Sequence, residues 1–286
     1  MHELKRVLVV GAGTMGSQIA LQTALSGLYD VTLLDTVTGQ LERARNQNTR
    51  LLSRSVEKGR LTQETADVAL ARIADSADLS VSGPAADLVI EAVIENFDAK
   101  RSVFEALAKH AKPEAILASN SSTIAISRLA DFTGRPQQCC NMHFFHPVTV
   151  MQLCEVVRGP KTTDSTIESA MQFVRSIDRT PVLLNKEIWG FIVNRILFAA
   201  SEEALHLLEG GYASAEDIDI AVQKGLNWPM GPFHLLDFSG LDIFYDAMKD
   251  RHRQGEGADA PELLRKIVEA GHLGRKSGQG FFEYPK

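Results

Sequence analysis

The chain has 286 residues, 44% of them hydrophobic, which is enough for one large or two moderate domains with a substantial core. Its formal net charge of −6 and the lack of a basic run argue against a nucleic-acid partner. The 3 cysteines are odd in number and two are adjacent, so a disulfide framework is excluded and a reducing compartment is favoured. Without CxxC or HExxH motifs we expect no metal site, and without an unbroken apolar run of about 18 residues we expect no membrane partner. These features predict a soluble, cytoplasmic protein.

Short apolar runs alternate with longer amphipathic ones over the first two-thirds of the chain. Runs typical of strands lie at residues 6–10, 30–35, 88–94, 115–119, 139–145, 153–157 and 180–185. Apolar residues at three- and four-residue intervals predict helices at residues 14–27, 38–58, 62–72, 97–111 and 165–177. This alternation predicts an α/β fold with a doubly wound, mostly parallel sheet and helices on both faces.

The pattern changes after Lys186. The segment "GFIVNRILFAASEEALHLLEGG" is typical of a long helix, and more helical segments follow without a convincing strand. We therefore expect two domains, at residues 1–186 and 187–286, of which the second is all-helical.

A glycine-rich turn follows the first expected strand. Gly11, Gly13 and Gly16 form a G-x-G-x-x-G pattern, and Asp35 ends the next strand roughly 20 residues further on. In a Rossmann-type domain these glycines permit a tight turn, a close approach of the backbone to a pyrophosphate, and close helix–strand packing. Asp35 can accept the ribose hydroxyls and would repel a 2′-phosphate, which favours NAD over NADP. The alternative is an ordinary tight turn with a surface aspartate.

Polar residues follow two further strands. Glu91 and Glu95 lie in "LVIEAVIEN", and "LASNSST" brings Asn120, Ser121 and Ser122 to the end of another strand. The carboxyl ends of parallel strands line the ligand crevice of such a sheet, so these groups could orient a polar substrate. The serines could equally cap the next helix, and the sequence leaves both interpretations open.

The stretch "NMHFFHPVTVMQLCEVV" contains two histidines and one carboxylate. If residues 139–145 and 153–157 are neighbouring strands, His143 and Glu155 can approach each other. A carboxylate beside an imidazole fixes its tautomer, as a general base requires. His146 lies past the strand end and has no obvious acidic partner. The spacing favours His143 as the base, and a packed structural histidine with an exposed Glu155 remains the alternative.

Together these segments resemble the 3-hydroxyacyl-CoA dehydrogenase family. The resemblance spans nearly the whole chain and rests on "VLVVGAGTMG", "EAVIENFDAK", "ASNSS", "HFFHPVTVMQLCEVV", "GFIVNRIL", "GPFHLLDFSGLD" and "GRKSGQGFFEY". It implies an NAD-binding domain, a helical dimerisation domain that would make the protein a homodimer, and the reversible oxidation of an (S)-3-hydroxyacyl-CoA thioester.

The resemblance also implies roles for individual residues. The catalytic positions match His143, Glu155, Ser122 and Asn194. Beyond the glycines and Asp35, the cofactor-side positions match Glu95, Lys100, His146 and Lys276. The coenzyme A contacts match Lys58 and, beside it, Arg54, with Ser122 holding the substrate hydroxyl; basic residues on a helix are also common on a solvated surface.

One departure from the family concerns His146, where an asparagine is usual. A histidine can still donate one hydrogen bond to the cofactor, and it would add a pH dependence to NAD binding. Rival functions are a dehydrogenase of a free hydroxy acid or hydroxylated amine, a dinucleotide-binding protein without catalysis, and a redox-sensing binding module. The presence of all four catalytic matches speaks against the non-catalytic protein, and a redox-sensing module would need NAD affinity without turnover.

Overall fold

The computed structural model describes residues 4–284. The chain forms two compact units, which divide between Phe191 and Ile192, whereas the sequence pattern placed the boundary near residue 186. Within the described residues, no helix is both long enough and apolar enough to cross a membrane. The three cysteines are free thiols and all are buried.

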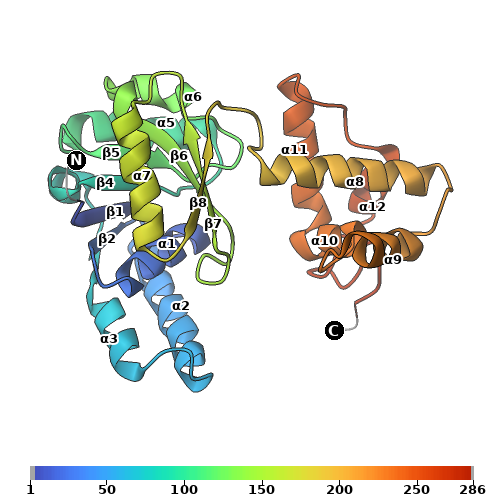
Figure 1. Cartoon of the computed structure of the whole chain (residues 1–286), viewed down its shortest axis with the longest axis horizontal. Helices are drawn as coiled ribbons and strands as arrows, with labels where there is room; N and C mark the ends of the chain where they lie inside the picture. Colours follow the sequence, from blue (N-terminus) through green and yellow to red (C-terminus); the bar gives the residue numbers. More distant parts are fainter. Residues whose placement is uncertain (1–3, 285–286) are drawn as a thin grey trace. The chain divides into compact units, whose positions relative to one another are not determined.

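The first unit contains one eight-stranded sheet with the strand order β3-β2-β1-β4-β5-β6-β7-β8 (Figure 1). The strands are β1 Arg6–Val10, β2 Asp30–Leu34, β3 Ile73–Ser76, β4 Leu88–Glu91, β5 Ile116–Ser119, β6 Cys139–Phe144, β7 Leu153–Arg158 and β8 Thr180–Leu184. Every neighbouring pair is parallel except β6 and β7, which are antiparallel. The expected Rossmann-type, mostly parallel sheet is confirmed.

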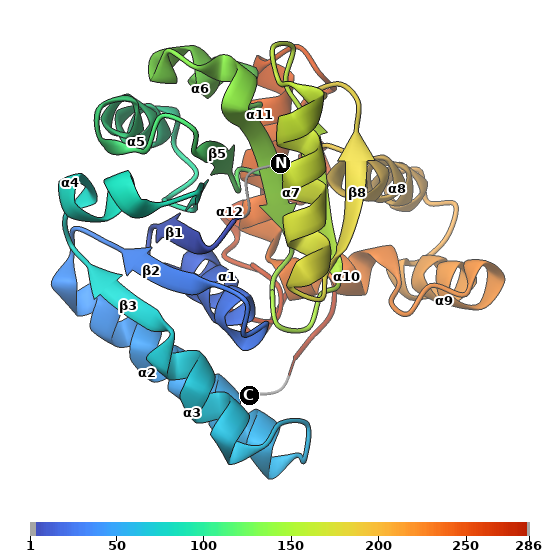
Figure 2. The same ribbon diagram turned by 60° about the vertical axis from the view of Figure 1, so that its left-hand side comes forward.

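Helices cover both faces of this sheet, because alternate strand residues point to opposite sides. Val7 and Val9 of β1 belong to one hydrophobic cluster, while Leu8 and Val10 belong to another. The first cluster includes residues of α1 (Thr14–Leu25), α2 (Thr38–Glu57) and α7 (Asp164–Ser176). The second includes residues of α5 (Phe97–His110) and α6 (Ser127–Ala130). Figure 2 shows α5 and α6 on one side of the sheet and α1 and α2 on the other.

Three short elements were missing from the sequence prediction, namely β3, α4 (Leu79–Ser82) and α6. β3 lies at the edge of the sheet, and its sequence "IADS" has no apolar run because its residues are exposed or only half-buried. The second is α4, a single turn in which the side chain of Asp78 accepts a hydrogen bond from Ser80 N. The third, α6, is also a single turn. Between α2 and β3, α3 (Gln63–Ala71) packs against α2 and forms a helical hairpin with it (Figure 2).

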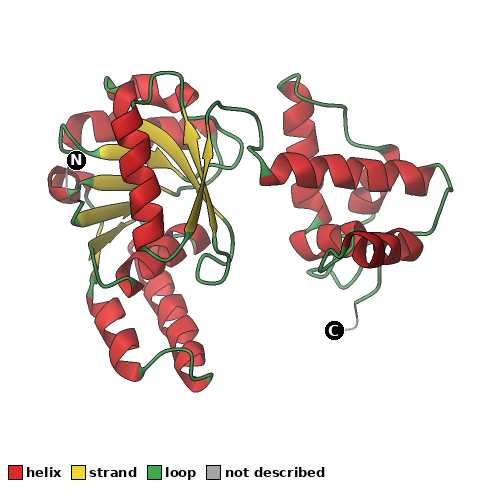
Figure 3. Cartoon of the chain, viewed as in Figure 1, coloured by secondary structure: helices red, strands yellow, loops and turns green. Residues whose placement is uncertain are grey.

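The second unit is helical, as expected (Figure 3). Its helices are α8 Val193–Glu209, α9 Ala215–Leu226, α10 Pro232–Ser239, α11 Leu241–Arg253 and α12 Glu262–Glu269. The buried carboxylate of Asp237 in α10 accepts hydrogen bonds from the backbone amides of Phe281 and Phe282 and from the Tyr284 hydroxyl. This carboxylate therefore ties the last described segment of the chain to the helices.

An ion pair is buried at the end of β4. Lys100 and Glu91 are 1% and 0% exposed, and Lys100 Nζ lies 2.8 Å from Glu91 Oε1. Glu91 also accepts hydrogen bonds from Val93 N at 2.7 Å and from Ser119 Oγ at 2.6 Å. Because these donors occupy both oxygens of the carboxylate, Glu91 can remain charged inside the protein.

Lys100→Met should lower the free energy of unfolding by about 3–5 kcal/mol, because it leaves a buried carboxylate without its cation. Urea unfolding monitored by circular dichroism measures this change. Lys109→Met, at an exposed position near the end of the same helix, is the matched control and should change stability by less than about 0.5 kcal/mol. Equal effects of the two substitutions would contradict the assigned importance of the buried pair.

Candidate active site

One edge of the sheet gathers most of the candidate residues. β1, β2, β4, β5 and β6 are parallel, so the segments that follow them leave the sheet at the same edge. β7 runs in the opposite direction and therefore begins at this edge. The glycine turn, the "IEN" segment, the "SNSS" segment and the end of β6 thus meet at the position where α/β sheets bind ligands.

The glycine turn has the geometry of a phosphate-binding loop. Gly11 has a φ of 104°, and a Cβ there would lie 2.7 Å from the carbonyl oxygen of Ala92. A Cβ on Gly16 would lie 1.8 Å from the carbonyl oxygen of Gly11, so the tightest approach is to the turn itself rather than to a strand. A Cβ on Gly13 would meet nothing within 4 Å. Gly13 also precedes α1 without any side-chain cap, which leaves its helix N-terminus suited to a phosphate group.

Asp35 lies beside this turn. Its Oδ2 accepts a hydrogen bond from Ala12 N at 2.9 Å, and its Oδ1 accepts one from Val37 N at 2.9 Å. Each carboxylate oxygen can accept a further bond. The half-buried Asp35 can therefore both hold the turn and receive ribose hydroxyls, as the NAD interpretation requires.

Glu95 organises the turn that follows β5. Its Oε1 accepts hydrogen bonds from Ser121 Oγ, from Ser122 N at 3.1 Å and from Thr123 N at 3.2 Å. Its Oε2 lies 3.1 Å from Lys100 Nζ. Desolvation would raise the pKa of the Glu95 carboxyl, but the Lys100 charge and the bond from Ser121 outweigh it, so the pKa lies below its usual value.

The structure separates the roles of the neighbouring serines. Ser121 Oγ accepts a hydrogen bond from Ile124 N at 2.8 Å, so this buried serine caps the turn. The half-buried Ser122 uses only its backbone amide, and its hydroxyl makes no hydrogen bond with residues 4–284. The sequence left capping and binding open for this pair, and the geometry leaves Ser122 as the hydroxyl that can bind a ligand.

His143 and Glu155 face each other across β6 and β7, as the strand register pairs these two residues. His143 Nδ1 lies 2.8 Å from Glu155 Oε2, and the residues are 6% and 0% exposed. The rings of Phe145 and Phe191 lie against the imidazole, at centroid distances of 4.5 and 5.6 Å. His143 Nε2 makes no hydrogen bond within the described residues. Glu155 is thus buried rather than exposed.

Three other predicted residues, His146, Arg54 and Lys58, also belong to the first unit. His146 is exposed just beyond β6. Arg54 and Lys58 lie at the end of α2 and line a pocket of about 470 Å³ together with Arg60 and Arg179. The pocket also contains apolar residues of α1 and α2, namely Leu21, Leu25, Leu51 and Leu52. It can therefore accommodate a ligand that has both anionic and apolar parts.

Asn194 and Lys276 belong to the second unit. Asn194 is half-buried in the first turn of α8, and its side-chain amide makes no hydrogen bond within the described residues. Lys276 Nζ lies 2.6 Å from Asp242 Oδ2. Desolvation opposes ionisation of Asp242, but Lys276 overcomes it and holds the pKa of that carboxyl below its usual value.

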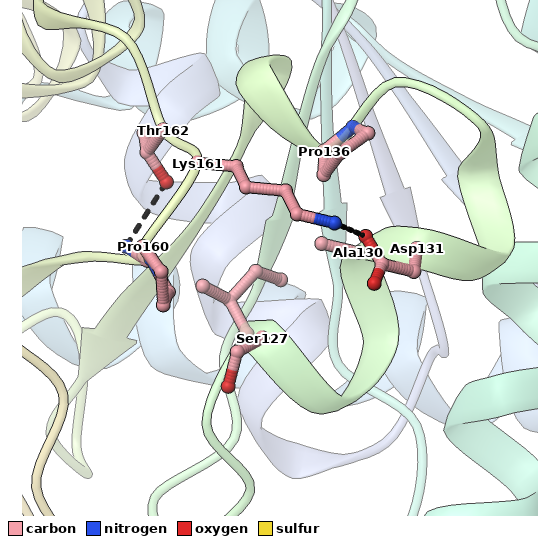
Figure 4. A pocket seen from close by; sticks show the side chains of 9 residues that line it. Ser127, Ala130, Asp131, Pro136, Pro160, Lys161 and Thr162 are labelled. Atoms are coloured by element: carbon pink, nitrogen blue, oxygen red, sulfur yellow. Dashed lines mark hydrogen bonds and ion pairs between the residues drawn. The ribbon is translucent and has the colours of Figure 1, made fainter.

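A second, smaller pocket lies near the start of β6 and the end of β7, at the opposite end of these strands from His143. In Figure 4, Lys161 reaches across it toward Asp131, and their charged atoms are 2.7 Å apart. None of the predicted site residues lines this pocket. Over residues 4–284, no group of three or more His, Cys, Asp or Glu side chains could hold a metal ion.

The structure gives structural roles to Asn120 and Glu91, which the sequence analysis placed at the ligand edge, and it adds Phe145 and Phe191. Asn120 Oδ1 accepts a hydrogen bond from Phe144 N at 2.9 Å, which links the serine turn to the end of β6. Glu91 pairs with the ammonium group of Lys100. Phe145 and Phe191 lie against the imidazole of His143. The sequence contained a signal for Glu91 and Asn120, because both lie at strand ends. No signal existed for Phe191, which approaches His143 only in the folded chain.

Comparisons with known proteins agree with this architecture. A family model described as "3-hydroxyacyl-CoA dehydrogenase, NAD binding domain" matches residues 6–188, and one described as "3-hydroxyacyl-CoA dehydrogenase, C-terminal domain" matches residues 190–284. A probable 3-hydroxybutyryl-CoA dehydrogenase of Deinococcus radiodurans is 43% identical over 279 residues, which are 96% of this chain and 99% of the relative. The 3-hydroxybutyryl-CoA dehydrogenase of Bradyrhizobium diazoefficiens is 41% identical over 98% of this chain and 96% of its own.

Solved structures show the same similarity. The crystal structure of (S)-3-hydroxybutyryl-CoA dehydrogenase from Ralstonia eutropha has a TM-score of 0.94 and is 36% identical, covering 99% of this chain and 100% of that one. The glycine turn, the open space at Gly13 and the position of Asp35 fit the NAD that the matched domain binds. The chain therefore belongs to the 3-hydroxyacyl-CoA dehydrogenase family of NAD-dependent oxidoreductases.

Proposed function

We propose that the chain interconverts (S)-3-hydroxyacyl-CoA and 3-oxoacyl-CoA thioesters of short chain length, with 3-hydroxybutyryl-CoA as the representative substrate. The observation that carries the proposal is the buried hydrogen bond between His143 and Glu155, at the same sheet edge as the glycine turn. The relatives named 3-hydroxybutyryl-CoA dehydrogenase support the choice of substrate.

His143 is the general base of this mechanism. The Glu155 carboxylate accepts a hydrogen bond from the N–H group at Nδ1, which fixes the tautomer that leaves a lone pair on Nε2. Nε2 then takes the proton of the substrate hydroxyl, and Glu155 stabilises the imidazolium that results. Bound NAD supplies the acceptor for the hydride from C3 of the substrate. The hydroxyl of Ser122 and the amide of Asn194 orient the reacting oxygen.

The pocket beside Arg54 and Lys58 is the site we assign to the coenzyme A part of the substrate. Its cations suit phosphate groups, and its leucines suit the apolar part of the molecule. His146 and Lys276 are assigned to the cofactor side of the site.

We also propose that two copies of the chain associate through the second unit. Several large apolar side chains of this unit are exposed, with exposed fractions of 58% for Ile196, 60% for Phe238 and 61% for Ile243. Apolar groups of this size on a surface commonly mark an interface, and a second copy of the chain would cover them.

The first test compares NADH consumption with acetoacetyl-CoA and with free acetoacetate at equal concentration. We expect turnover with the thioester and at least about 100-fold less with the free acid, because the acid lacks the part of the substrate that contributes remote binding energy. Turnover of free acetoacetate alone would instead identify a free hydroxy acid as the substrate, and NADH binding without turnover of either would identify a non-catalytic binding protein.

Lys58→Ala should raise KM for the thioester by about 3–10-fold, since it removes one exposed phosphate contact.

His143→Ala should reduce kcat by about 10²–10⁴-fold while NADH binding is unchanged, because only proton transfer is lost. Glu155→Gln keeps the size of the side chain but removes its charge, and should cause a smaller decrease. His110→Ala, at the end of α5, is the control. Activity of His143→Ala similar to that of the control would exclude His143 as the base.

Sedimentation of the purified protein tests the association. We expect a species of twice the chain mass of 31.3 kDa, and substitution of Phe238 and Ile243 by Asp should shift it to the mass of one chain, because both charges would be buried in the interface. Val81→Asp, at an exposed apolar position of the first unit, is the control. A wild-type protein that sediments at the mass of one chain would contradict the proposal.

A further inference from the structure

A row of buried and half-buried charges runs from the core to the edge of the sheet. Lys100 is 1% exposed and its ammonium group lies between two carboxylates, 2.8 Å from Glu91 and 3.1 Å from Glu95. Glu91 is fixed in turn by Ser119 and by the backbone of Val93. The Glu95 carboxylate is 40% exposed, yet this buried cation holds it in one orientation.

The other oxygen of Glu95 is fully used by the turn that carries Ser122. Four donors from three consecutive residues converge on Oε1: the Ser121 hydroxyl, the Ser122 amide, the Thr123 amide and the Thr123 hydroxyl, the last at 3.0 Å. Charge-assisted hydrogen bonds of this kind are stronger than neutral ones. The turn is therefore attached to the core through one carboxylate.

The opposite side of the same turn is attached to the strand of His143. Asn120 N donates to the carbonyl oxygen of Glu91 at 2.8 Å, and Asn120 Oδ1 accepts from Phe144 N at 2.9 Å. Ser122 thus lies between two anchors, and its hydroxyl is left without a partner in the described part of the chain. Such an arrangement presents one hydroxyl in a defined direction relative to the imidazole.

We propose that Glu95, oriented by Lys100, is a positioning residue that sets the direction of the Ser122 hydroxyl. This inference rests on the proposed function, in which Ser122 binds the reacting oxygen of the substrate. It differs from the cofactor contacts that the family resemblance implies for Glu95 and Lys100. Lys100 acts on the substrate through Glu95, because its ammonium group is buried between two carboxylates and is not available to a ligand.

A double-mutant cycle tests the proposal. Kinetics are measured for wild type, Glu95→Ala, Ser122→Ala and the double variant, together with the dissociation constant of NADH. Glu95→Ala should lower kcat by about 10–100-fold, because a small displacement of an orienting group is costly, and should change the NADH dissociation constant by less than about threefold. The double variant should be within about threefold of Ser122→Ala, since the two residues act on the same interaction.

Glu105→Gln is the matched control for removal of a carboxylate. Glu105 lies on α5, the helix that carries Lys100. Its side chain is 46% exposed and pairs with Arg101 at 3.3 Å, but it has no bond to the turn. Its kcat should equal that of the wild type. A Glu95→Ala variant that loses NADH affinity in proportion to kcat/KM, with effects that add to those of Ser122→Ala, would show a cofactor contact alone and overturn the proposal.

Hydrogen exchange tests the positioning without any turnover. The amides of Ser122, Thr123 and Ile124 are protected by Glu95 and Ser121. Glu95→Ala should accelerate exchange in the peptide covering residues 120–124 by at least about tenfold, because the bonds to Oε1 are lost. Unchanged protection there would overturn the positioning role even if the enzyme were active. An inactive wild type with accelerated exchange in the variant would refute the proposed function and leave the attachment of the turn intact.

Discussion

The buried ammonium group of Lys100 is the constraint on which much of the site depends. A lysine that is 1% exposed needs negative partners, and Glu91 and Glu95 supply them. One partner belongs to β4 in the core and the other to the segment that follows it. The requirement to neutralise a single charge therefore joins the interior of the sheet to the turn that carries Ser122.

The second feature on which the site depends is the direction of β7, which runs antiparallel to β6. In an all-parallel sheet, β7 would end rather than begin at the ligand edge, and a residue near its start would be far from the end of β6. The antiparallel pairing puts Glu155 directly across from His143, where the two side chains share a buried hydrogen bond. The neighbouring rings of Phe145 and Phe191 limit the movement of the imidazole. The direction of one strand thus gives the proposed base, His143, its carboxylate partner.

The elements that repeat a clear pattern were predictable. Strands such as β1 and β6 are buried on both faces and consist mostly of apolar residues, and α1 and α7 show helical spacing of apolar residues. β3 was missed because an exposed edge strand does not need apolar residues on both sides. α4 was missed for a different reason, because a single capped turn is too short to show any periodicity.

The sequence by itself determined the local features: the glycine turn, the aspartate after the next strand, the hydroxyl-rich segment after β5, and one histidine and one carboxylate on two strands that follow each other along the chain. These depend on spacing along the chain, which the order of residues contains. Tertiary structure alone decided that Ser121 caps the turn while the Ser122 hydroxyl makes no hydrogen bond with residues 4–284, and that Glu95 and Lys100 belong to one charged network. Those outcomes depend on burial and on contacts between segments that are distant in sequence, because the energy of a charge or a hydroxyl is set by the groups that surround it in the folded chain.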